Sequence, residues 1–96
     1  MSRDGRATVR QKEASELVIT GVDASGLAFE EKTEARDISE EGLSFYLGHQ
    51  LWVNSHLTAA VISSSIFASS YVARAMVIRI KVDPSGKQFV AVRFNE

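Results

Sequence analysis

The sequence predicts an all-β protein, a six-stranded antiparallel β-barrel with a flexible N-terminal arm. Three observations support this fold class. Six runs of β-branched or alternating residues follow one another at short spacing, two of their connections are strong hairpin turns, and the single Pro lies in one of those turns. Because an open sheet of six strands would leave two edges and one face bare, closure into a small barrel is favoured.

The first two strands form a predicted hairpin. The β-branched run ELVITGV at 16–22 is followed by Asp-Ala-Ser-Gly at 23–26, in which Gly26 can supply the positive φ that such a turn needs. The next run, 27–38, alternates charged side chains with Leu27, Phe29, Thr33 and Ala35. This period of two predicts a half-buried strand.

Two more strands are expected in the middle of the chain. GLSFYL at 42–47 alternates apolar residues with Ser44 and Tyr46. After a bend near Gly48, the runs LWVN at 51–54 and HLTAAVIS at 56–63 suggest a fourth strand. Residues 63–70 fit either a loop or a helix.

A second hairpin ends the chain. YVARAMVIRIKV at 71–82 and QFVAVRF at 88–94 are joined by DPSGK, in which Pro84 sets φ and Gly86 can adopt the left-handed conformation. Strand periodicity predicts that one face of the long strand carries Val72, Met76, Ile78, Ile80 and Val82.

Composition indicates one soluble globular domain. The 96 residues are 45% hydrophobic, carry a formal net charge of −1 and include no Cys. Disulfides and Cys-based zinc sites are excluded, the cytoplasm is the default location, and bulk charge does not favour binding to a nucleic acid polymer. No secretory signal is visible, and polar residues interrupt the uncharged stretch 51–73 too often for membrane insertion.

The first twelve residues differ in character from the rest. They are polar and include one acidic residue, Asp4, and four basic residues, Arg3, Arg6, Arg10 and Lys12. We expect residues 1–12 to be a flexible arm and residues 13–96 to form the barrel.

Signatures of catalysis are absent. The sequence holds no Walker loop, no HExxH and no nucleophile elbow, so no enzyme activity is expected. His49 and His56 have no acidic partner at ligand spacing, and the Glu residues fit a solvated face or a turn. No metal site and no cofactor are predicted.

Two motifs remain. Arg6-x-x-x-Arg10 is either a solvated basic tail or a pair of guanidiniums that grip a phosphate or a guanine edge. Asp37-x-Ser39-x-x-Gly42 is either a capped turn with Gly42 at positive φ, or a polar ledge. On such a ledge a carboxylate accepts from guanine N–H groups, a hydroxyl bonds a base edge or phosphate, and Gly lets the backbone come close.

The two motifs together resemble the PilZ family, bacterial receptor domains for cyclic di-GMP. RATVR at 6–10, DISEEG at 37–42 and the closing FVAVRF match the family pattern, so the resemblance covers nearly the whole chain. It implies a six-stranded barrel on which Arg6 and Arg10 clamp the ligand from the arm. Asp37 would read a guanine edge, Ser39 would hydrogen-bond nearby and Gly42 would give backbone room.

The resemblance also implies a switch mechanism, and one alternative function stays open. The arm would order on binding and relay occupancy to a downstream protein or fused domain. Glu40 and Glu41 would weaken binding if they point inward, and Gly5, where many members carry a further Arg, favours a single bound nucleotide. The alternative is a PilZ-like interaction module that no longer binds nucleotide; a general single-strand nucleic acid barrel would need a basic aromatic groove.

Overall fold

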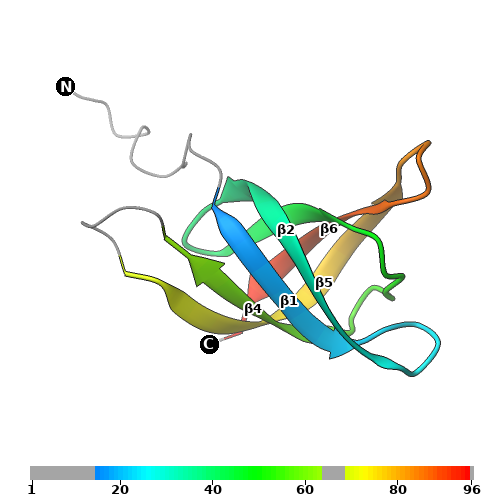
Figure 1. Cartoon of the computed structure of the whole chain (residues 1–96), viewed down its shortest axis with the longest axis horizontal. Helices are drawn as coiled ribbons and strands as arrows, with labels where there is room; N and C mark the ends of the chain where they lie inside the picture. Colours follow the sequence, from blue (N-terminus) through cyan, green and yellow to red (C-terminus); the bar gives the residue numbers. More distant parts are fainter. Residues whose placement is uncertain (1–14, 64–68, 96) are drawn as a thin grey trace.

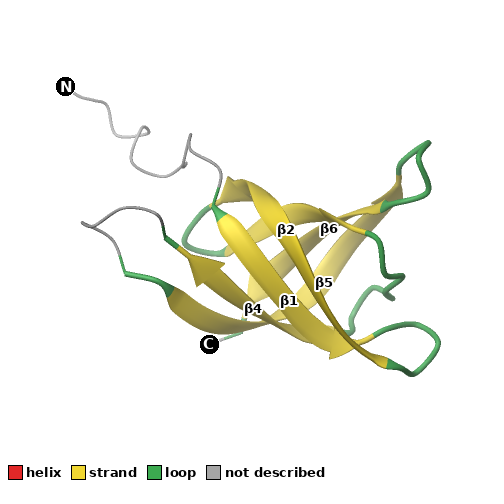
Figure 2. Ribbon diagram, viewed as in Figure 1, coloured by secondary structure: helices red, strands yellow, loops and turns green. Residues whose placement is uncertain are grey.

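The computed structural model describes residues 15–63 and 69–95 and confirms the predicted six-stranded antiparallel β-barrel (Figures 1 and 2). The predicted arm, residues 1–12, lies outside the described residues. Its six strands are β1 (Glu16–Val22), β2 (Ala28–Ile38), β3 (Gly42–Leu47), β4 (His56–Ile62), β5 (Tyr71–Val82) and β6 (Gln88–Phe94). They close into a barrel in the order β1-β2-β3-β6-β5-β4, and every neighbouring pair is antiparallel. Within the described residues, no helix is long and apolar enough to cross a membrane.

Both predicted hairpin turns are confirmed. Gly26 and Gly86 adopt φ of 92° and 93°, a conformation that glycine takes without steric penalty. In the first turn the Asp23 carboxylate accepts hydrogen bonds from the backbone N–H groups of Ser25 and Leu27, at 2.9 and 3.1 Å. Side chain and backbone therefore favour the same tight reversal between β1 and β2.

The core fills the inside of the barrel with apolar side chains from all six strands. Its largest fully buried members are Phe45, Leu17, Ile19, Leu47, Val77 and Val90. Burying each such side chain contributes about 1.5–3 kcal/mol. The core therefore holds the strands in one register, and the alternate positions are left on the outer face.

The connection from β3 to β4 differs from the prediction. Residues 51–54 are not a strand, and β4 begins only at His56. The backbone N–H of Leu51 donates to the side chain of Gln88 on β6 at 2.9 Å and not to the backbone of a strand. Asn54 has a φ of 76°. The apolar character of LWVN thus reflects the burial of Leu51, while Trp52 is 67% exposed.

Glu31 anchors the start of the same connection. Its carboxylate accepts from the backbone N–H of Gly48 at 2.9 Å and lies 2.5 Å from the Nδ1 atom of His49, whose ring stacks on Phe29. Partial burial raises the pKa of Glu31, but the hydrogen bonds from Gly48 and His49 outweigh it, so the pKa lies below the usual 4.5. The charged carboxylate therefore stabilises the loop.

The predicted faces of two strands need correction. The five apolar residues expected on one face of β5 do not share it, because the register of β5 shifts between Val77 and Arg79. Val72 is 69% exposed, whereas Ile80, beyond the shift, packs against the core. Leu27 lies before β2 in the turn and is exposed, while Phe29 and Ala35 are buried as expected.

Candidate functional site

Two β-bulges place charged residues on the outer face of the barrel. In β2, Ala35 pairs with Phe45 and Asp37 with Ser44, so Arg36 is an extra residue in the ladder. In β5, Val77 pairs with Val92 and Arg79 with Ala91, so Ile78 is the extra residue. Without these bulges the period of two would direct Asp37 and Arg79 into the core; with them, both side chains are exposed on the outside.

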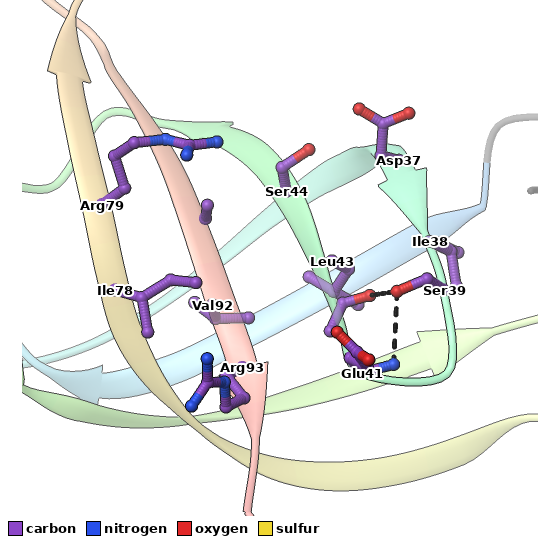
Figure 3. A pocket seen from close by; sticks show the side chains of 12 residues that line it. Asp37, Ile38, Ser39, Glu41, Leu43, Ser44, Ile78, Arg79, Val92 and Arg93 are labelled. Carbon is purple, nitrogen blue, oxygen red and sulfur yellow. Dashed lines mark hydrogen bonds between the residues drawn. The ribbon is translucent and has the colours of Figure 1, made fainter.

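The two bulges lie in one row across four strands. Asp37 on β2 is paired with Ser44 on β3, Ser44 with Ala91 on β6, and Ala91 with Arg79 on β5. A carboxylate and a guanidinium therefore stand at opposite ends, with two small side chains between them (Figure 3). With strands about 4.8 Å apart, the row spans about 14 Å of backbone.

A cavity of about 280 Å³ lies over this row. It is lined by all three residues of the predicted Asp37-x-Ser39-x-x-Gly42 motif, and further along by Ser44, Arg79 and Arg93. The structure therefore brings the motif residues together on one side of the barrel, with basic groups on the other side of the same cavity.

Ser39 shapes the turn at one end of the cavity. Its backbone N–H donates to the Gly42 carbonyl at 2.9 Å, and its hydroxyl accepts from the backbone N–H of Glu41 at 3.2 Å. The same hydroxyl donates to the Gly42 carbonyl at 3.4 Å. The capped-turn interpretation is therefore correct for Ser39, and these bonds position Asp37 just before the turn.

Gly42 is needed for a different reason from the one expected of a turn glycine. Among the described residues, positive φ occurs at Gly26, Gly86 and Asn54, and not at Gly42. A Cβ atom at Gly42 would instead lie 1.9 Å from the carbonyl oxygen of Val92 on β6. The absence of a side chain lets β3 and β6 pair at the edge of the cavity.

Two further residues of the cavity were not predicted from the sequence. Ser44 is 7% exposed, and its hydroxyl is buried without a hydrogen-bond partner. Arg79 is exposed and, among the described residues, has no ion pair or hydrogen bond to its side chain. A polar residue inside the apolar run GLSFYL was a signal for Ser44, whereas the placement of Arg79 depends on the bulge.

The surroundings of the cavity carry both signs of charge. Glu41 lines it, whereas Glu40 lines an adjoining hollow together with Glu41 and Arg93. On the next outer row, the Arg36 guanidinium lies 5.7 Å from the centre of the Tyr46 ring, a cation–π distance. Of the two acids expected beside the site, Glu41 therefore borders the cavity itself, and Glu40 lies at its margin.

The other predicted groups are outside the cavity. Arg6 and Arg10 lie outside the described residues, so their predicted roles remain predictions. His49 is engaged with Glu31 in the β3–β4 connection, and His56 is exposed at the start of β4. No group of three or more potential metal ligands occurs within the part of the chain that the structure describes.

The fold is a small closed antiparallel barrel, and it is similar to part of a protein of known structure. No family model matches the sequence, and no curated protein matches it. Among solved structures, the chain is similar to the Bacillus subtilis inhibitor of motility MotI/DgrA, with a TM-score of 0.70 and 22% identity over 92% of this chain. This chain spans 41% of that protein, and the likeness concerns the fold.

Proposed function

We propose that this protein is a non-enzymatic receptor domain for cyclic di-GMP. The observation that carries the proposal is the outer-face cavity, because one site gathers Asp37, Ser39 and Gly42 at the spacing that resembles the PilZ family. The closed barrel with the same strand number as that family, and the structural likeness to a motility inhibitor, support it.

The proposed recognition divides between the barrel and the arm. The exposed Asp37 carboxylate accepts hydrogen bonds from the N1–H and N2–H groups of a guanine, because its two oxygens match these two neighbouring donors. Arg6 and Arg10 close over the nucleotide and donate to a guanine edge or a phosphate. Ser39 keeps the turn in the shape that presents Asp37, so its contribution is positional as well as direct.

Signal transfer in this proposal uses the arm rather than the barrel. Among the described residues, the barrel is closed by six antiparallel strand pairs. Residues 1–12, ordered over the occupied cavity, would present a new surface to a downstream protein or a fused domain. A receptor for an intracellular messenger acts in the cytoplasm, without a cofactor, a nucleic acid polymer or membrane insertion. The similar Bacillus protein makes motility the first output to examine.

Calorimetric titration with cyclic di-GMP tests the proposal. Wild-type protein is expected to bind with saturable heat, and Asp37→Ala or Arg10→Ala to lose about 1–3 kcal/mol of binding free energy, which is roughly five- to 150-fold in affinity. Glu16→Ala is a matched control, because Glu16 is an exposed carboxylate on the outer face of β1, away from the cavity lining. Absence of heat with the wild-type protein would reject the receptor function.

One observation favours the alternative of a protein-interaction module. Trp52 and Val72 are 67% and 69% exposed, so both side chains are available to contact a protein partner. Under this alternative, a pull-down recovers the same partner with and without nucleotide, and Trp52→Ala or Val72→Ala reduces recovery while Asp37→Ala does not. The receptor hypothesis instead predicts that nucleotide changes the recovery.

A further inference from the structure

Arg79 occupies the end of the cavity opposite Asp37. The bulge at Val77 and Arg79 turns its side chain from the core to the outer face, in the same row as Asp37 and Ser44. Only Ala91 separates Arg79 from Ser44, and its methyl group leaves room for a long side chain to lie across β6. Figure 3 shows the Arg79 guanidinium directed across β6 toward Ser44.

Ser44 is an independent sign that the cavity is built for a ligand. Leaving a buried hydroxyl without a hydrogen bond is unfavourable, and Ala would occupy the same position without that penalty. Ser44 is one of the residues that line the cavity, and the Arg79 side chain is directed toward it (Figure 3). A donor of this kind is satisfied when an acceptor oxygen enters the cavity.

We infer that Ser44 and Arg79 form a phosphate-binding half of the site, opposite the guanine-binding half at Asp37. The Ser44 hydroxyl and the Arg79 guanidinium donate to oxygens of one phosphodiester of the ligand. A guanidinium suits this task, because its planar array of N–H donors matches two phosphate oxygens. The inference rests on the proposed function and adds to it two specificity-determining residues that lie on the barrel and not on the arm.

Arg93 also lines the cavity but does not fit this role. It belongs to the next row, where it is paired with Gly42, and it borders the hollow that Glu40 and Glu41 line. The two carboxylates beside Arg93 make the local electrostatic potential more negative, which disfavours the binding of an anion there. Arg79, in contrast, lines the main cavity and is not among the residues that line the hollow beside Glu40.

The inference is tested by titrating cyclic di-GMP into Ser44→Ala, Arg79→Ala, Arg79→Lys and the double variant Ser44→Ala/Arg79→Ala. We expect each Ala variant to bind about tenfold more weakly and Arg79→Lys to be intermediate. Because both groups bind one phosphate, the double variant should lose less than the product of the single effects. Arg74→Ala is the control: Arg74 is an exposed Arg on the same strand but is not part of the cavity lining, and its binding should equal that of the wild type.

Thermal unfolding of the free proteins separates a ligand role from a structural one. Ser44→Ala should melt at or above the wild-type temperature, since it removes an unsatisfied group, while binding falls. Wild-type affinity in both Ser44→Ala and Arg79→Ala, with binding lost in Asp37→Ala, overturns the phosphate assignment and leaves the receptor function standing. Absence of wild-type binding rejects the receptor function, and this assignment with it.

Discussion

Gly42→Ala separates two explanations of the last position of the Asp37-x-Ser39-x-x-Gly42 motif. The family resemblance assigns Gly42 the task of giving room to a ligand. The structure gives it a task within the barrel, because an added Cβ would lie 1.9 Å from the Val92 carbonyl oxygen, 3.0 Å from the Val92 carbonyl carbon and 3.1 Å from the Arg93 Cα atom. We therefore expect Gly42→Ala to destabilise the free protein.

The expected size follows from the geometry of the β3–β6 pair. Contacts below 3.0 Å essentially do not occur for real Cβ atoms, so the two backbones must separate by about 1 Å at this end of the ladder. The contact is to backbone, which cannot rotate away like a side chain. Disrupting two or three ladder hydrogen bonds at about 1 kcal/mol each gives a loss of about 2–3 kcal/mol. For a domain of this size that corresponds to a fall in Tm of roughly 10–20 °C.

Thermal unfolding followed by circular dichroism measures this loss, with Gly21→Ala as the matched control. Gly21 is also a strand glycine, but the nearest atom to its Cβ position is the Leu57 Cβ at 3.4 Å, an ordinary contact. Gly21→Ala should change stability by less than about 1 kcal/mol, in either direction. A Gly42→Ala protein that melts with the wild type would refute the structural explanation, and reduced cyclic di-GMP binding by that protein would then support the ligand role.

Other perturbations test the loop anchors and the arm. Gln88→Ala should lower stability by about 1–3 kcal/mol in urea unfolding, because it leaves the buried Leu51 backbone without its partner. Glu31 has a lowered pKa, so its stabilising effect is present above about pH 4.5 and is lost as the pH falls through the folded-state pKa. Glu31→Gln should therefore lower Tm at pH 7, and the difference from the wild type should shrink in acid; an equal difference at pH 7 and pH 3 would contradict this. Arg6→Ala and Arg10→Ala should each reduce cyclic di-GMP affinity by about 1–3 kcal/mol in calorimetry and leave the Tm of the free protein unchanged. A large fall in Tm would show that these arginines are structural.

The strands and hairpins were predictable because their causes are local. Asp23 and Gly26 define one turn within four residues, and Pro84 and Gly86 define the other. The bulges were not predictable in the same way. A bulge exists only relative to a partner strand, so the side on which Asp37 or Arg79 points depends on the register of its pairing with Ser44 or Ala91 and not on the pattern within one strand.

Only one side of the candidate site was predictable from the sequence. The spacing of Asp37, Ser39 and Gly42 identified one side of the cavity, since these residues are close together in the chain. Ser44 lacked a signal strong enough to separate it from an ordinary strand serine, because its burial and its unpaired hydroxyl arise only in the folded barrel. The close approach of Gly42 to Val92 also arises from tertiary pairing, and the motif alone suggested a turn glycine instead.

The most direct test of the account is to map the binding surface by NMR, following backbone amide shifts of the wild-type protein during addition of cyclic di-GMP. We expect saturable shifts concentrated on the row from Asp37 through Ser44 and Ala91 to Arg79, with the β1–β4 face, including Thr20 and Thr58, unchanged. No shifts at saturating nucleotide, or shifts centred on the β1–β4 face, would contradict it.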